Sequence, residues 1–224
     1  MSTPARNSES VAAGPDARTR RRPSSTRARI LDIAERLVQE RGYNAFSYAD
    51  VAAELGVTTA SLHYHYAGKA ELGKALIARY TQRFGQELER IDGQDGDARA
   101  KLSAYASLYA QALRGQRMCL CGMLAAEYRT LPKAVRRSVV QFFDDNQAWL
   151  TGILEDGRAA GTLSFEGAPH DTAQMIISGL EGAMLVARPY GDPQRFGAAS
   201  RRLLAALSSS PAHRARRAPA RPGA

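Results

Sequence analysis

Hydroxyl, imidazole and phenol side chains are concentrated in the segment that follows Gly56. These groups donate and accept hydrogen bonds, which suits the phosphates and base edges of DNA. Leu62 interrupts them and is expected in the core, whereas Thr58 also suits the cap of a short helix. The candidate contacts are Thr58, Thr59, Ser61, His63, Tyr64 and His65.

Metal binding and catalysis are both disfavoured by the pattern. His63 and His65 are two residues apart, so on a helix they diverge by about 200°, and no second ligand cluster accompanies them. The chain has no Gly-x-Ser-x-Gly elbow, phosphate-binding loop or zinc signature. Four acids that could pair for catalysis also suit solvated helix faces, namely Glu127, Asp144, Asp145 and Glu155. We therefore expect no metal, no cofactor and no catalytic residue.

The elements that position the polar segment are a helix and a tight turn. Ser47 with Asp50 three residues later forms a capping-box pattern, and an apolar stripe runs from Val51 to Leu55. Gly56 then ends this helix, because glycine takes the left-handed conformation cheaply. A helix, a glycine turn and a second helix are the arrangement that puts the second helix into a DNA major groove.

The pattern resembles the N-terminal DNA-binding domain of the TetR family of bacterial transcriptional regulators. The resemblance runs from Arg27 to about Leu76, through ARILDIAERLVQERGY, DVAAELGV, TTASLHYHY and GKAEL. These match the first helix, the second helix, the recognition helix and the start of a fourth helix. The chain departs from the family at His63, where tyrosine is usual, and at Tyr66, where phenylalanine is common.

The DNA contacts implied by this resemblance extend beyond the recognition helix. Lys69 stands in the first turn of a helix, where a cation opposes the helix dipole unless an anion binds there, so a phosphate contact is expected. The alternative is an exposed lysine balanced by Glu71. The full set of expected DNA-binding residues is Arg27, Ser47, Thr58, Thr59, Ala60, Ser61, His63, Tyr64, His65 and Lys69.

The net charge of +9 lies in the two ends of the chain, because Ile30 to Leu207 has as many acidic as basic residues. Residues 1–29 carry +5 and residues 208–224 carry +4. A basic arm before the first helix suits DNA phosphates or the minor groove. Its alternative is a solvated tail that only aids solubility, and that alternative is favoured for the proline-rich C-terminal end.

Helical periodicity continues from Lys69 to the end of the folded region, with no alternating strand pattern. The segment from Ala173 to Ala187 is apolar on two faces, one through Ile176, Leu180 and Met184 and the other through Met175, Gly179, Ala183 and Val186. A helix with two apolar faces must bury both, against its own core and against a partner. The resemblance implies that this helix and the last one (193–207) form a four-helix dimer interface. The alternative is that one chain covers both faces.

A ligand cavity between the C-terminal helices is implied by the resemblance, and its lining is inferred from residue type. The expected lining residues are Tyr105, Tyr109, Cys119, Met123, Phe142, Asn146, Trp149 and Met175, with Met184 beside them. Ordinary core packing is the alternative for each. Cys119 and Cys121 suit buried hydrophobic positions, and a redox or electrophile sensor is the alternative reading.

We therefore predict an all-α protein with an N-terminal helix-turn-helix three-helix domain and a C-terminal helical ligand-binding and dimerisation domain. Residues 1–24 form a disordered basic arm, 25–68 the DNA-binding domain, 69–207 the effector domain and 208–224 a disordered basic tail. Helix 69–91 links the two domains. No apolar run is long enough to span a bilayer and the start lacks a secretory signal, so we expect no membrane partner and a cytoplasmic location.

The predicted function is a ligand-responsive transcriptional regulator similar to TetR-family repressors. It would bind a palindromic operator in double-stranded DNA as a homodimer, with half-sites roughly 34–36 Å apart, and be released by a small-molecule effector. Two alternatives remain open at this point. One is a small-molecule-binding protein with a vestigial DNA domain, and the other is an architectural DNA binder without an effector.

Overall fold

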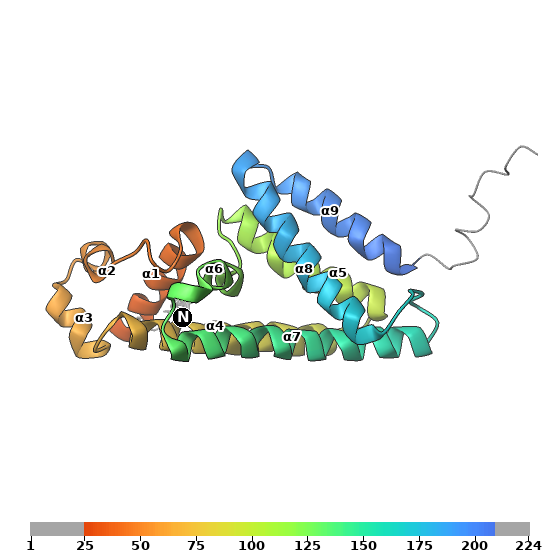
Figure 1. Ribbon diagram of the computed structural model, residues 1–224, viewed down its shortest axis with the longest axis horizontal. Helices are drawn as coiled ribbons and strands as arrows, with labels where there is room; N and C mark the ends of the chain where they lie inside the picture. The colour runs from red at the N-terminus through yellow and green to blue at the C-terminus, as the bar shows by residue number, and fades with distance from the viewer. Residues whose placement is uncertain (1–24, 209–224) are drawn as a thin grey trace, which may run out of the picture.

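Nine α-helices and three short 3-10 helices make up residues 25–208, the part of the chain that the computed structural model describes (Figure 1). No strand occurs in this range, and the all-α prediction is confirmed. The predicted basic arm and residues 209–224 of the predicted tail lie outside it. The N-terminal helices are α1 (Thr26–Arg41), α2 (Tyr48–Leu55), α3 (Thr59–His65) and α4 (Lys69–Asp92).

The C-terminal part contains five further α-helices, and none of the helices in residues 25–208 is long and apolar enough to cross a membrane. They are α5 (Ala98–Arg114), α6 (Leu120–Ala126), α7 (Lys133–Ala159), α8 (Pro169–Ala187) and α9 (Pro193–Ala205). The 3-10 helices η1 (Tyr128–Thr130), η2 (Arg188–Tyr190) and η3 (Ala206–Ser208) follow α6, α8 and α9. Cys119 is the non-helical residue that caps the start of α6.

Local sequence signals set the boundaries of α1 and α2. The Ser47 and Asp50 pattern is a true capping box, in which each side chain accepts a hydrogen bond from the other residue's backbone N–H. Gly56 ends α2 with φ of 70°, in the left-handed region that favours glycine. In this conformation the Gly56 N–H donates to carbonyls in the last turn of α2. The chain then turns sharply into α3.

The long helix α4 is shared by the two halves of the molecule. It lies beside α7 along one edge, with α1–α3 gathered at one end and α5, α8 and α9 stacked over the other (Figure 1). Its first turns bury Leu72, Leu76 and Ile77, and its last turns bury Leu88 and Ile91. One continuous helix therefore contributes to the core at both ends of the molecule.

Helix α8 is the centre of the C-terminal half, where it packs against α7 on one side and α9 on another. The predicted inward stripe is buried as expected, at Ala173, Ile176, Ile177, Leu180, Met184 and Ala187. A Cβ on Gly179 would come within 2.8 Å of Leu203 Cδ2, so the missing side chain lets α9 approach closely. Met175, Leu185 and Val186 face the other way, and they are 47%, 61% and 63% exposed.

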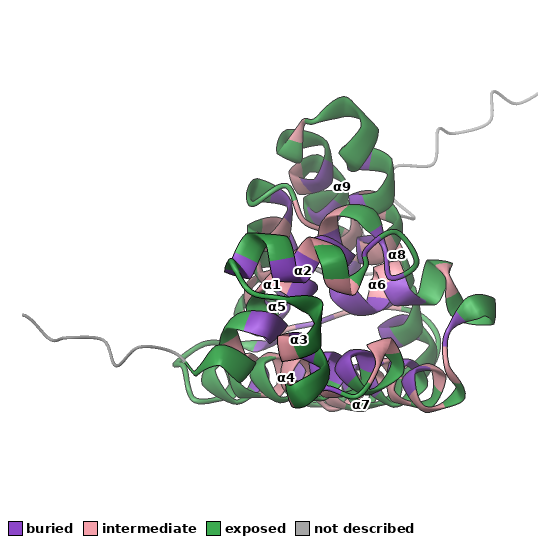
Figure 2. Ribbon diagram, turned by 90° about the vertical axis from the view of Figure 1, so that its left-hand side faces the viewer, coloured by how far each residue is buried: buried purple, intermediate pink, exposed green. Residues whose placement is uncertain are grey.

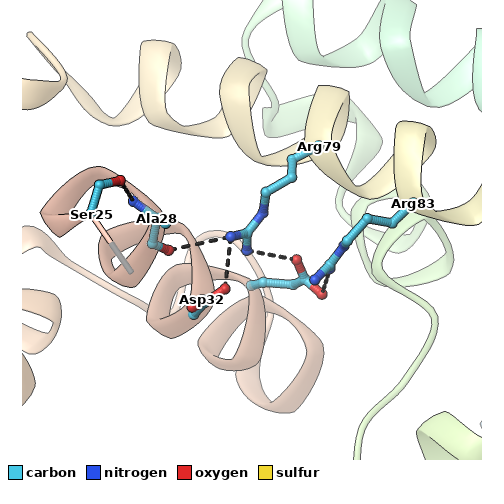
Figure 3. Close-up of polar contacts among 6 residues, drawn as sticks. Ser25, Ala28, Asp32, Arg79 and Arg83 are labelled. Atoms are coloured by element: carbon cyan, nitrogen blue, oxygen red, sulfur yellow. Dashed lines mark hydrogen bonds and ion pairs between the residues drawn. The ribbon is translucent and has the colours of Figure 1, made fainter. Parts of the chain in front are cut away.

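Charged side chains join α1 to α4 at the boundary of the domains. Arg79 donates from Nη1 to Asp32 Oδ1 at 2.7 Å and from Nη2 to Glu35 Oε2 at 3.0 Å. Arg83 pairs with the other oxygen of Glu35, and Arg79 also donates to the Ala28 carbonyl. Figure 3 shows both guanidinium groups directed from α4 toward α1. Only 7% of Glu35 is exposed, so this carboxylate depends on both arginines for its solvation.

Glu35→Ala should lower the free energy of unfolding by about 2 kcal/mol or more, because it leaves two arginines without their shared partner. Asp32→Ala is the matched control. The Asp32 side chain is 57% exposed and forms one ion pair, so its loss should amount to less than about 1 kcal/mol. Urea unfolding of both variants measures the difference. Equal losses would refute the special role assigned to Glu35.

Candidate nucleic-acid interface and buried polar cluster

The recognition segment is a seven-residue helix held by one buried side chain. Leu62 is 1% exposed and fixes α3 against the domain, as predicted, whereas Tyr64 is 87% exposed. Thr58 lies at the N-cap, and its hydroxyl accepts a hydrogen bond from the Ser61 N–H at 3.3 Å. Thr59, Ala60, His63 and Tyr64 are exposed, and Figure 2 shows α3 largely exposed when it is viewed from this end of the molecule.

The end of α3 is anchored to α2 by aromatic residues. Helix α3 stops at His65, one residue earlier than predicted, because Tyr66 turns extended and buries its ring. Tyr48 donates its hydroxyl to the Tyr66 carbonyl at 3.0 Å, and its ring lies 4.7 Å from the His63 ring. His63 therefore helps to hold the helix in place, while Tyr64 projects away from the domain.

The other predicted DNA contacts surround this helix. The Arg27 guanidinium lies 4.7 Å from the centre of the Tyr66 ring, and its Nε donates to the Tyr66 hydroxyl at 3.2 Å. Ser47 is exposed at the N-cap of α2, where its hydroxyl is engaged with Asp50. The structure thus brings Arg27, at the start of α1, to the end of α3.

Lys69 begins α4 and is partly turned into the domain. Its ammonium lies 4.9 Å from the Tyr43 ring centre and 4.5 Å from the Phe46 ring centre, and it donates to the Phe46 carbonyl. Burial lowers the pKa of Lys69 from its ordinary value, while Glu127 and Asp50 oppose that change. An ammonium has three N–H donors, so two are left after the Phe46 bond. Its predicted phosphate contact stays a prediction.

A buried polar cluster occupies the middle of the C-terminal half. The Tyr105 hydroxyl lies 3.0 Å from the Tyr109 hydroxyl and donates to Asn146 Oδ1 at 3.1 Å. Asn146 in turn donates from Nδ2 to the Phe142 carbonyl at 2.7 Å. The sequence placed these four residues around a ligand cavity, and the structure brings all of them together in the core.

Cys119 connects this cluster to α4 and α8. The Tyr80 hydroxyl on α4 donates to Cys119 Sγ at 3.7 Å, and Cys119 is also hydrogen-bonded to Glu181 on α8. Burial and the nearby Glu181 carboxylate raise the pKa of the Cys119 thiol well above its ordinary value. Both cysteines are free and buried. Their surroundings therefore favour the neutral thiol over the reactive thiolate.

Glu181 is the unusual member of the cluster. Burial raises its pKa to about 7, and the hydrogen bond with Cys119 opposes that rise. Its Oε1 is buried without a hydrogen-bond partner in the described part of the chain. Gly122 gives the carboxyl its space, since a Cβ there would collide with Glu181 Oε2. A buried carboxyl group with an unpaired oxygen can form a hydrogen bond with a bound ligand.

Three of the predicted lining residues lie at the margin of the cluster or outside it. Trp149 stacks on Tyr105 at 5.6 Å and donates to Asp92, and Met123 contacts Arg188 through its sulfur. Met175 is 47% exposed on the outer face of α8, because it lies opposite the buried stripe. Cavities of about 710, 600 and 170 Å³ open elsewhere in residues 25–208, and none of the three is lined by the eight predicted residues.

Sequence reasoning missed Tyr80 and Glu181. Neither residue is among the site residues that the sequence pattern predicts. The available signal was position, since Glu181 lies one turn after Ile177, at the edge of the buried face of α8. A single carboxylate on a buried face needs a partner or a raised pKa.

Glu181→Gln should flatten the pH dependence of stability. The Glu181 pKa is about 7 in the folded protein against an ordinary 4.5, so folding takes up a proton between these values. The unfolding free energy of the wild type should fall as pH rises from about 4.5 to about 7, by roughly 3 kcal/mol at most. Glu155→Gln, an exposed residue on α7, is the control and should keep the wild-type profile. Parallel profiles for wild type and Glu181→Gln would overturn this assignment.

Comparison with known proteins shows which family of proteins this chain resembles. Residues 30–76 match the family model described as bacterial regulatory proteins, tetR family, and residues 96–203 match a tetracyclin repressor-like C-terminal domain. Among curated relatives, the transcriptional regulator AcuR of Cereibacter sphaeroides is 28% identical over 66% of this chain and 70% of its own. The repressor NemR of Escherichia coli is 27% identical over 73% of this chain and 84% of its own.

A solved structure resembles the whole described region. A TetR-family transcriptional regulator from Agrobacterium tumefaciens superposes with a TM-score of 0.79 and 32% sequence identity. The match covers 82% of this chain and 97% of that one. It therefore includes both the helix-turn-helix and the C-terminal helices. On these grounds the chain belongs to the TetR family of DNA-binding transcriptional regulators.

Proposed function

We propose that this regulator is a repressor that binds a palindromic operator as a homodimer and leaves it when a small molecule binds the C-terminal half. The observation that carries the proposal is the exposed face of α3, presented on a short helix whose only buried residue is Leu62. Repression is inferred from relatives named as repressors, such as NemR. The operator lies in bacterial DNA, so the proposed place of action is the cytoplasm.

DNA recognition is proposed to divide between two sets of residues. Thr59, Ala60, Ser61, Tyr64 and His65 would meet base edges in the major groove, since they share α3 with no competing core role. Arg27, Ser47, Thr58, His63 and Lys69 would position the domain through phosphates. The first turn of α4 supports this role, because Gly68 gives it no side-chain cap and leaves backbone N–H groups for an anion.

The dimer is proposed to form through α8 and α9. Met175, Leu185 and Val186 form an exposed apolar face on α8, and Gly182 beside them has open space where a side chain would be. Burying such a face against its own copy satisfies the second apolar stripe of the helix. Two copies related by a two-fold axis would present two α3 helices to successive major grooves.

Effector release is proposed to act through α4. Tyr80 reaches into the buried polar cluster, while its neighbour Arg79 holds Glu35 on α1. A ligand that takes the hydrogen bonds of Cys119, Glu181 or Asn146 would have to displace side chains now packed there, Tyr80 among them. The shift would pass along α4 to α1 and change the separation of the two recognition helices. By linkage, such a ligand binds less tightly to the DNA-bound form.

Tyr64→Ala should weaken operator binding by about tenfold or more, and it should leave stability unchanged because the side chain is 87% exposed. The operator is first recovered by selecting genomic fragments with the purified protein, and affinity is then measured by gel shift. Tyr190→Ala removes another exposed tyrosine, on η2, and should bind like wild type. Equal binding of wild type to any duplex would support an architectural role instead.

Val186→Glu should convert the dimer to monomers, because it places a charge in the proposed apolar contact. Val140→Glu is the matched control, since Val140 is also exposed but lies on α7. Sedimentation equilibrium measures both variants, and operator affinity should fall with dimerisation. A Val186→Glu protein that stays dimeric would rule out this face as the interface.

A further inference from the structure

A groove between α5 and α9 has a volume of about 710 Å³. This volume falls within the range of small-molecule sites. The floor is apolar and consists of Leu102, Ala106, Leu163 and Phe196, all of them buried. The groove shares no residue with the buried polar cluster, although α5 contributes to both.

The rim of the groove is positively charged. Arg99, Arg114 and Arg201 line it, and no aspartate or glutamate is among the lining residues. Arg99 donates to the Thr162 carbonyl, whereas Arg114 and Arg201 form no ion pair within residues 25–208. Guanidinium groups bind oxyanions strongly and often through two N–H donors. Within residues 25–208, the rim therefore offers positive charge that no acidic side chain neutralises.

Along α5, the apolar residues of the groove lie between two arginines. Arg99 and Arg114 lie near opposite ends of this helix, roughly 22 Å apart at 1.5 Å per residue. Leu102, Ala106 and Ala110 lie between them at four-residue spacing, so they share one face. Arg201 stands across the groove on α9. A ligand would fit this arrangement if its apolar part lay along α5 and its anionic group contacted one of the arginines.

We propose that the α5–α9 groove binds an amphipathic organic anion, such as a medium-chain carboxylate, at a site separate from the buried polar cluster. The C-terminal segment 209–224 is a poor occupant, because its four arginines and lack of acidic residues repeat the sign of the rim. Met175, Leu185 and Val186, which carry the proposed dimer contact on α8, are not among the residues that line the groove, whereas α9 contributes to both surfaces.

The test measures binding of decanoate to the full chain by isothermal titration calorimetry, below its critical micelle concentration. Decanol and decyltrimethylammonium keep the apolar chain without the negative charge, and acetate keeps the charge without the chain. Decanoate should bind at least about tenfold more tightly than all three. Arg114→Ala and Arg201→Ala should each weaken decanoate binding by about tenfold, whereas Arg202→Ala, an exposed neighbour outside the lining, should not.

A blocked groove gives a second readout that does not depend on charge. Ser107 is exposed on the lining, so Ser107→Trp should fill the groove and abolish decanoate binding without loss of the fold. Gln141→Trp, at an exposed position on α7 outside the lining, is the control. Equal binding of decanol and decanoate would overturn the proposal. The proposal would also be overturned if decanoate binding survived Ser107→Trp but was lost in Glu181→Gln. The same holds if decanoate bound only after removal of residues 209–224.

Discussion

The Glu35 carboxylate, shared by Arg79 and Arg83, is the interaction on which the two halves of this protein depend. It joins α1, which supports the DNA-binding domain, to α4, which enters the core of the C-terminal half. Tyr80, next to Arg79 on the same helix, contacts the buried cluster at Cys119. One turn of α4 therefore faces both domains. A displacement of that turn cannot leave either domain unchanged, because cores are close-packed.

The buried cluster has a different physical character from this ion pair. Tyr105 donates to Asn146, and Cys119 has Tyr80 and Glu181 as partners, but within residues 25–208 Glu181 keeps one oxygen without a partner. Buried polar groups with unused bonding capacity cost stability, and proteins keep them where function requires them. The cluster therefore offers a hydrogen-bonding ligand one unused acceptor, but such a ligand would have to displace side chains that are packed there.

Local signals predicted the N-terminal domain well, whereas the C-terminal site depended on tertiary packing. The Ser47 capping box, the Gly56 turn and the buried Leu62 follow from short-range rules, and each is confirmed. Tyr80 and Glu181 come from helices a hundred residues apart along the chain, and no spacing rule connects them. Met175 was expected both on the outer stripe of its helix and in the cavity lining, and its 47% exposure agrees with the outer stripe.

The shortness of α3 has an evolutionary consequence. At seven residues the helix is far below the length that is stable alone, so its shape is imposed by Leu62 and by the Tyr48 and Tyr66 contacts. Thr59, Ala60 and Tyr64 have no part in those contacts. Under the proposed function, related chains can thus exchange these three side chains and acquire new target sequences, while the scaffold that presents them stays intact.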